Sequence, residues 1–190
     1  AHKIIGPNGV GALISTKENL DLLNQFMVGG ETVTDSSYES YPPEKIPEKF
    51  EAGLQNYPGI IGFGAATKYL ENITVKNIQK QIVKLNEIAT SGLSEISGIE
   101  ILGPKGADKR SGVISFVIKD KQVHEVSLLL NNTYNIMVRS GAHCVHSWFN
   151  KDKNKESVFK DGTVRASFSF YNTEEEVQQF VQAVKEISEL

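Results

Sequence analysis

The spacing of apolar residues changes near residue 74, and this change constrains the fold more than any other feature. From there to about residue 97, apolar residues recur every three or four positions, as on the buried face of an amphipathic helix. Strand-like patterns follow at residues 99–102, 113–118, 136–138 and 163–170, with a helical pattern at 123–131. Thr173-Glu174-Glu175-Glu176 is a capping box that opens a last helix from residue 173 onward. This order predicts an α+β domain with helices packed on a small, mainly antiparallel sheet.

The first 73 residues contain too few regular elements to bury a core of their own. They read as an apolar run of strand length at residues 10–15, a helix from Lys17 to about Gln25 capped by Thr16, an irregular excursion at 31–49 and a helix at 57–70. The last of these is rich in small residues, which predicts close packing against a neighbour. We therefore divide the chain into residues 1–73, the tail of a larger domain, and residues 74–190, a small α+β domain.

Composition excludes several classes of partner. A formal net charge of −3 gives no basic field for nucleic acid or an anionic membrane. No apolar run is long enough to span a bilayer, and no signal pattern follows the first residue. We therefore expect neither a nucleic-acid nor a membrane partner, and a cytoplasmic location.

The single cysteine, Cys144, excludes an internal disulfide and a Cys-rich zinc site. A lone cysteine is ordinarily a small buried hydrophobe. Here it follows His143 and lies five residues after Arg139, and a thiol between such groups has the environment of a nucleophile. Two alternatives are weaker: a Cys–His protease, and a zinc site formed by His143, Cys144 and His146. We expect no metal.

Two other clusters carry potential chemistry. His2 and Lys3 precede a glycine-rich turn, and a lysine in such a loop can form an imine with an aldehyde cofactor, although most lysines are solvated surface charges. Arg165 lies in a predicted strand and offers a bidentate fork for a carboxylate. A surface arginine is an equally good interpretation of Arg165 from the residue pattern alone.

Five motifs occur in a fixed order along the chain. They are His-Lys with Gly-Pro-Asn-Gly-Val-Gly at residues 2–11, Gly-Gly-Glu at 29–31, Phe-Glu-Ala-Gly at 50–53, Arg-Ser-Gly-Ala-His-Cys at 139–144, and Arg-Ala-Ser with Tyr-Asn-Thr at 165–173. In this order they resemble the C-terminal half of the cysteine desulfurase and selenocysteine lyase branch of the class V, fold-type I enzymes, which depend on pyridoxal 5′-phosphate (PLP). The resemblance implies the small C-terminal domain of that fold, preceded by a remnant of the large domain.

The resemblance also implies a set of cofactor contacts. Lys3 would bind PLP covalently and move the substrate's α-proton, and His2 would lie beside the cofactor. Gly30 would approach the PLP phosphate of the other subunit, because enzymes of this family are homodimers with shared active sites.

For the substrate, L-cysteine, the resemblance implies four further roles. Arg165 would hold the carboxylate, and Cys144 would accept the sulfur as a persulfide while L-alanine is released. Arg139 and His143 would shape the loop that carries the thiol. A sulfur-acceptor protein, in iron–sulfur cluster assembly or another delivery route, would then take the sulfur.

Three departures from the family pattern bear on these expectations. Lys49 and Leu54 stand where the family has arginine and threonine, and the charged stretch at 151–156, expected to be a solvated loop, lengthens the connection from Cys144 to Arg165. The family's remaining PLP ligands precede the lysine, so we expect the isolated chain to be inactive. Selenocysteine lyase or another class V PLP enzyme is an alternative function, and a non-catalytic dimerisation or interaction domain is another.

Overall fold

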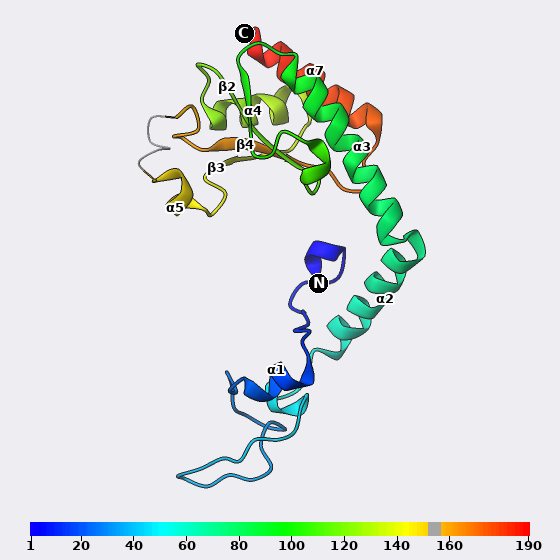
Figure 1. Cartoon of the computed structure of the whole chain (residues 1–190), viewed down its shortest axis with the longest axis vertical. Coiled ribbons are helices and arrows are strands. Elements are labelled where there is room, and N and C mark those ends of the chain that lie inside the picture. Colours follow the sequence, from blue (N-terminus) through cyan, green and yellow to red (C-terminus); the bar gives the residue numbers. More distant parts are fainter. Residues whose placement is uncertain (152–156) are drawn as a thin grey trace. The chain divides into compact units, whose positions relative to one another are not determined.

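The computed structural model describes residues 1–151 and 157–190 (Figure 1). Apart from Lys151, the charged stretch at 151–156 lies outside the described residues. The chain divides into two compact units, an N-terminal unit of residues 1–73 and a C-terminal unit of residues 74–190. Among the described residues, no helix combines the length and apolar character needed to cross a membrane.

The C-terminal unit is built on a four-stranded antiparallel sheet with the order β1-β2-β4-β3. The strands are β1 (Ile99–Leu102), β2 (Val113–Ile118), β3 (Arg139–Gly141) and β4 (Thr163–Ser167), and the main helices are α3 (Val75–Ser94), α4 (Val123–Tyr134) and α7 (Glu174–Ser188). A short helix, α5 (His146–Phe149), follows β3. The expected α+β class with a small antiparallel sheet is thus confirmed.

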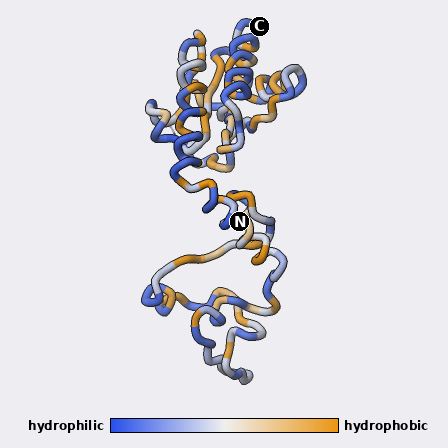
Figure 2. Tube along the Cα trace, turned by 90° about the vertical axis from the view of Figure 1, so that its right-hand side faces the viewer, coloured by the Kyte–Doolittle hydropathy of each residue, from blue (hydrophilic) through white to orange (hydrophobic). Residues whose placement is uncertain are grey.

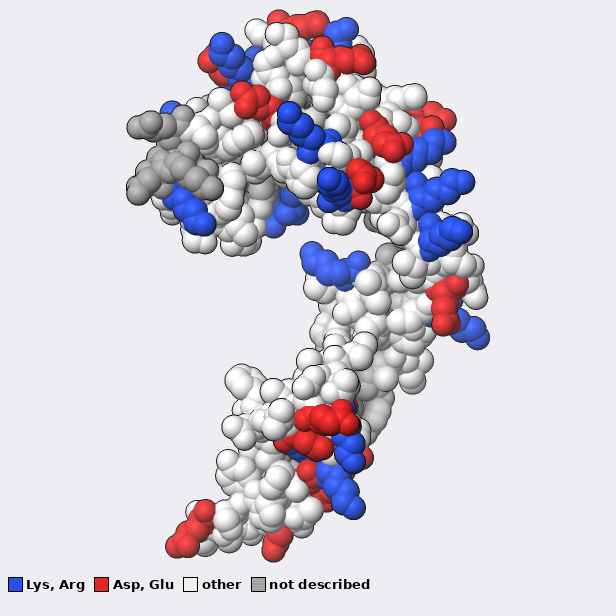
Figure 3. Space-filling view, in the orientation of Figure 1, with Lys and Arg blue, Asp and Glu red and all other residues white. Residues whose placement is uncertain are grey.

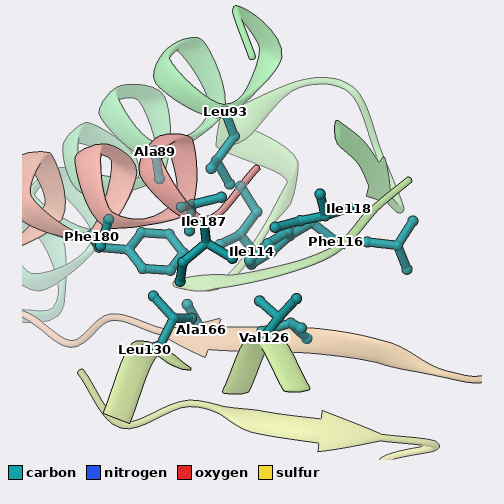
Figure 4. Close-up of a cluster of buried hydrophobic side chains, with 14 of the residues drawn as sticks. Ala89, Leu93, Ile114, Phe116, Ile118, Val126, Leu130, Ala166, Phe180 and Ile187 are labelled. Atoms are coloured by element: carbon teal, nitrogen blue, oxygen red, sulfur yellow. The ribbon is translucent and has the colours of Figure 1, made fainter. Parts of the chain in front are cut away.

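One face of the sheet and the three main helices share a single core, in which α3 lies along α7 (Figures 1 and 4). Alternate residues of a strand point to opposite faces, so the buried Ile114, Phe116 and Ile118 of β2 and Val164 and Ala166 of β4 mark the face turned to the helices. Phe180 of α7 packs edge-to-face against Phe116, with 5.9 Å between ring centroids. Residues between these positions, including Arg165, therefore belong to the opposite face.

Local signals in the sequence fix the ends of two of these helices. Thr173 and Glu176 form the expected capping box of α7, in which each side chain accepts a hydrogen bond from the other's backbone amide. The side chain of Thr74 caps α3 in a similar way, accepting from the amide of Asn77 at 3.3 Å. On the face of this unit drawn in Figure 3, Lys and Arg side chains lie among Asp and Glu side chains, so neither sign of charge dominates there.

The third strand differs from its prediction. It was expected at residues 136–138, but the pairing with β4 covers Arg139–Gly141. Asn135 ends α4 in a left-handed conformation (φ 56°), and the amide of Ile136 donates back to the carbonyl of Leu130 at 3.0 Å. Residue 136 therefore belongs to the helix end, and strand pairing begins only at Arg139. The fourth strand ends at Ser167, earlier than the expected residue 170.

The N-terminal unit contains α1 (Lys17–Leu22), α2 (Tyr57–Ile73), the 3-10 turns η1 (His2–Ile4) and η2 (Glu48–Phe50), and a single β-bridge between Val33 and Pro43. Ala66 is the only buried hydrophobic residue of this unit, whose residues are all described. Its hydrophobic stretches (orange in Figure 2) are largely exposed, with Phe26 at 96% and Ile14 at 90%.

Two predictions for the N-terminal unit need correction. Residues 10–15 do not form a strand, because none of the strands among the described residues pairs with their backbone. In α2 the close packing is confined to a few positions: Gly59 and Ala66 are buried and a Cβ atom at Gly62 would lie 3.1 Å from the ring of Pro7, whereas Ile61 is 74% exposed.

We predict that two leucines of α4 differ sharply in their effect on stability. Leu130→Ala should lower the free energy of unfolding by about 2–5 kcal/mol, because the Leu130 side chain is fully buried. Leu128→Ala is the matched control on the same helix: Leu128 is 61% exposed, and the change should stay within about 0.5 kcal/mol. Urea unfolding followed by the fluorescence of Trp148, the only tryptophan, measures both. Equal losses would contradict this orientation of α4.

Candidate active site

Two arginines face each other across strands β3 and β4. Arg139 pairs directly with Arg165, and both lie on the face of the sheet opposite the helix-covered one. Like charges placed opposite each other on neighbouring strands are destabilising. This edge of the sheet therefore favours the binding of an anion.

Arg139 also contacts the only thiol of the chain. Its Nη2 donates a hydrogen bond to Cys144 Sγ at 2.9 Å, and Cys144 is free and exposed. A sulfur in contact with a guanidinium and open to solvent has the environment in which cysteines act as nucleophiles. The cysteine is therefore a reactive candidate and does not fill a core position.

His143 anchors the loop that carries this thiol. Its Nε2 lies 2.8 Å from Thr163 Oγ1 and 3.1 Å from the carbonyl oxygen of the same residue. Because a carbonyl oxygen can only accept, Nε2 must carry the hydrogen. Nδ1 is then the acceptor nitrogen of the neutral ring, and it is buried without a hydrogen-bond partner among the described residues.

The surroundings of His143 keep its ring neutral. Burial lowers the pKa of His143, and the positive charges of Arg165 and Arg139 lower it further, against a smaller opposing effect of the hydrogen bond to the Thr163 backbone. Protonation would create a buried, unpaired N–H at Nδ1 close to two guanidinium groups. His143 therefore serves the loop as a neutral hydrogen-bond donor.

Backbone geometry turns this loop sharply. His143 (φ 51°) and Cys144 (φ 66°) are both left-handed, and the amide of Val145 closes the turn on the carbonyl of Ala142 at 2.8 Å. At the base of the loop, Gly162 packs against the backbone of Gly141 so closely that a Cβ atom would lie 2.5 Å from the Gly141 carbonyl group. A side chain at position 162 would displace the start of the loop.

Arg165 has a donor that nothing in the described chain uses. The side chain is half-buried, and its Nε is buried without a hydrogen-bond partner. An unpaired buried donor is costly, so a ligand that supplies an acceptor would stabilise this position. A carboxylate fits, since a guanidinium binds it through two parallel hydrogen bonds.

The structure thus brings together Arg139, His143, Cys144 and Arg165. The other expected site residues, His2, Lys3 and Gly30, lie in the N-terminal unit, apart from this cluster in the chain. His2 and Lys3 are exposed in η1, where the amides of Ile4 and Gly6 donate to the carbonyl of Ala1.

Gly30 lies in a turn that a buried threonine holds. The hydroxyl of Thr32 donates to the carbonyl of Gly29 at 2.8 Å and accepts from the Gly29 amide at 3.0 Å. The carbonyl of Gly30 accepts from the amide of Gly53 at 2.9 Å, and the space where a Cβ of Gly30 would lie is open. The backbone at Gly30 is therefore accessible to a ligand.

The two family departures are found in ordinary surroundings. Lys49 donates to the carbonyl of Leu20 at 3.4 Å and lies over the ring of Phe50, while Leu54 is 93% exposed. Among the described residues, no three His, Cys, Asp or Glu side chains gather as a metal ion requires, so the zinc alternative at His143, Cys144 and His146 has no support.

The family model described as aminotransferase class-V matches residues 1–180. The chain belongs to the class-V aminotransferase family. A relative from Pyrococcus abyssi, described as a probable cysteine desulfurase, is 39% identical over 183 residues, which cover 96% of this chain and 44% of that protein. This confirms the family, and specifically its cysteine desulfurase branch, as the set of proteins that the chain resembles.

Solved structures agree with this placement in class V. The apo structure of a cysteine desulfurase from Thermococcus onnurineus NA1 matches with a TM-score of 0.87 and 36% identity, covering 98% of this chain and 44% of that chain. An S-sulfonic acid form of a cysteine desulfurase from Escherichia coli matches with a TM-score of 0.82 and 26% identity, covering 99% and 44%. The chain thus spans less than half the length of these relatives.

Two residues beneath the loop were not predicted from the sequence. Thr163 and Gly162 precede Arg165, and a threonine in a strand reads as an ordinary β-former. The available signal was a pair of glycines, Gly141 at the end of β3 and Gly162 directly before β4, because glycine in or beside a strand often marks close backbone approach.

We predict that His143 makes the stability of the chain depend on pH below neutrality. Its pKa is lower in the folded chain than the ordinary value near 6.5, so the unfolded state binds more protons as pH falls below that value. The free energy of unfolding should therefore be highest above about pH 6.5 and decrease as the pH falls through the folded value. Urea unfolding at several pH values, compared with His143→Gln, measures this contribution. Identical pH dependence in the two proteins would contradict it.

Proposed function

We propose that the complete protein is a PLP-dependent cysteine desulfurase that takes sulfur from L-cysteine onto Cys144 and releases L-alanine. The contact between Arg139 and Cys144 Sγ, next to the unpaired donor of Arg165, carries the proposal. It places a nucleophilic sulfur and a carboxylate anchor at one edge of the sheet. Relatives described as cysteine desulfurases support the same activity.

Lys3 is the proposed cofactor residue. Its exposed primary amine has the chemistry to bind the aldehyde of PLP, and His2 beside it would flank the ring. Bound PLP would supply an electron sink that weakens the Cβ–S bond of cysteine. Lys3 would move the α-proton of the substrate.

The open backbone at Gly30 would meet the PLP phosphate of a second subunit, so the active enzyme would be a homodimer. Many apolar side chains of the N-terminal unit are exposed, which supports the proposal that another protein surface covers this unit in the complete enzyme. We propose that residues 1–73 are the end of the PLP-binding large domain and that residues 74–190 are the small domain.

The sulfur-transfer step follows from the groups on the C-terminal unit. Arg165 would hold the substrate carboxylate through two hydrogen bonds, which fixes the substrate for attack. The Cys144 sulfur would attack the substrate sulfur, so that an S–S bond forms as the Cβ–S bond breaks. The electron pair of the broken bond stays with the carbon fragment, which takes up a proton and leaves as alanine. His143, neutral and bonded to Thr163, would hold the loop in place during this step.

The persulfide on Cys144 is exposed and so can be passed to a sulfur-acceptor protein, for iron–sulfur cluster assembly or another route, in the cytoplasm. Selenocysteine lyase activity is the alternative within the same family. Cys144 favours the desulfurase, because simple elimination from selenocysteine needs no thiol acceptor.

We predict that Cys144→Ser in the complete enzyme abolishes persulfide formation and leaves PLP binding intact, because Cys144 is the only thiol of this chain. Persulfide formation is measured by trapping labelled sulfur on the protein after incubation with labelled cysteine, and PLP binding is measured by visible absorbance. Ser147→Ala, a change on the neighbouring helix α5, is the control and should keep both. Labelled sulfur on the serine variant would assign the acceptor role to another residue.

We also predict that the 190-residue chain alone folds at least from Thr74 onward but does not turn over cysteine. The C-terminal unit has its own core, whereas Lys3 is exposed and the chain covers only 44% of its relatives. PLP bound to Lys3 in that setting would lack the preorganised surroundings that it needs to act as an electron sink. The measurement is alanine release from the purified chain after PLP and cysteine are added. Sustained release that requires Lys3 would show that no further sequence is needed.

A further inference from the structure

Thr163 lies at the first position of β4, directly under the loop that carries Cys144. Its backbone pairs with Gly141 of β3, and its hydroxyl and carbonyl both lie within hydrogen-bonding distance of His143 Nε2. The residue is fully buried although it is polar. A buried hydroxyl in a strand is stabilised only when it is paired, and its partner here is the residue next to the nucleophile.

The neighbouring Gly162 contributes to the same support. It has a left-handed backbone (φ 94°) and lies against the carbonyl group of Gly141, so no side chain fits between the two strands at this point. Gly162 and Thr163 together support the loop of residues 142–145. Gly162 allows its backbone to approach that of Gly141, and Thr163 binds the imidazole of His143.

We infer that Thr163 is a positioning residue for sulfur transfer, which fixes the loop of Cys144 through its hydroxyl bond to His143. This rests on the proposed desulfurase function for its consequence in catalysis, but the positioning itself is a property of the chain. Thr163 does not touch the sulfur. It holds His143, and His143 sets the left-handed turn that brings Cys144 Sγ to Arg139.

A role in packing alone predicts a different result from a role in positioning. Thr163→Val keeps the branched shape and the carbonyl acceptor and removes only the hydroxyl. Thr163→Ser keeps the hydroxyl and removes a methyl group. If Thr163 merely fills space, serine should be the more damaging change. If it positions the loop, valine should be, and serine should restore the parent behaviour.

The test is hydrogen exchange by NMR on the 190-residue chain, read at the amide of Val145, which donates to the carbonyl of Ala142 within the loop. Thr163→Val should lower the protection of this amide by about threefold to tenfold, the range for one lost hydrogen bond. Thr163→Ser should stay within about twofold of the parent. The amide of Ile78, bonded to the carbonyl of Thr74 at the start of α3, should be unchanged in both.

Thr90→Val is the control, because it removes a hydrogen-bonded threonine hydroxyl elsewhere in the domain. This hydroxyl donates to the carbonyl of Asn86 in α3 and accepts from Arg110. Thr90→Val should lower global stability and leave Val145 protection unchanged. Unchanged protection in Thr163→Val, or equal loss in the serine and valine variants, would overturn the inference. If Thr163→Val does not fold, His143→Gln tests the same bond from the other side and should reproduce the loss at Val145.

Kinetics of the complete enzyme separate this inference from the proposed function. Thr163→Val should lower kcat for alanine release by a similar factor and leave KM for cysteine unchanged, because Arg165 is untouched. If Thr163→Val loses Val145 protection but the parent enzyme forms no persulfide, the desulfurase function is refuted and the positioning role stands. If the parent enzyme forms persulfide normally and Thr163→Val keeps full Val145 protection, the positioning role is refuted and the desulfurase function stands.

Discussion

Burial of one sheet face under α3, α4 and α7 is the constraint from which the candidate site follows. Val164 and Ala166 must point into the helix-covered core, and the alternation of a strand then turns Thr163 and Arg165 to the other face. A shift of β4 by one residue would bury the guanidinium of Arg165 and expose the apolar side chains, so the core fixes the register strongly. The same register sets Arg139 opposite Arg165. Hydrophobic packing on one face thus places charge on the other.

Sequence patterns located the elements whose signals are local. Strands β1 and β2 were predicted with their observed bounds, because each is a short β-rich run between turn residues, and the capping box at Thr173 marked the start of α7. The third strand was misplaced because the apolar run at 136–138 has strand-like residues, but Ile136 bonds back to the end of α4 and strand pairing begins only at Arg139. The prediction of a strand at 10–15 was wrong for a different reason. A strand needs a partner strand, and the local sequence does not show whether one is present.

For the site, the motif from Arg139 to Cys144 was enough to predict that its members act together, because they are joined by a short loop. Arg165 could be connected to them only through family resemblance, since strand register depends on residues far apart in the chain. Thr163 was missed on the same ground: its partner His143 is 20 positions away, and threonine is common in strands. Contacts of this kind are set by the fold and leave no local periodicity in the sequence.

The conformation of the loop shows why these distant contacts are needed. His143 and Cys144 are consecutive residues in the left-handed region, where a residue with a side chain costs about 1–2 kcal/mol. Glycine would relieve that cost, but neither position can be glycine, because one must bond Thr163 and the other must supply the sulfur. The turn is therefore held against its own backbone preference by the bond from His143 to Thr163, the contact of Arg139 with Cys144, and the close seat of Gly141 on Gly162. Strain of this kind persists only where surrounding contacts over-determine the geometry, and in this chain those contacts converge on the atom proposed to carry the sulfur.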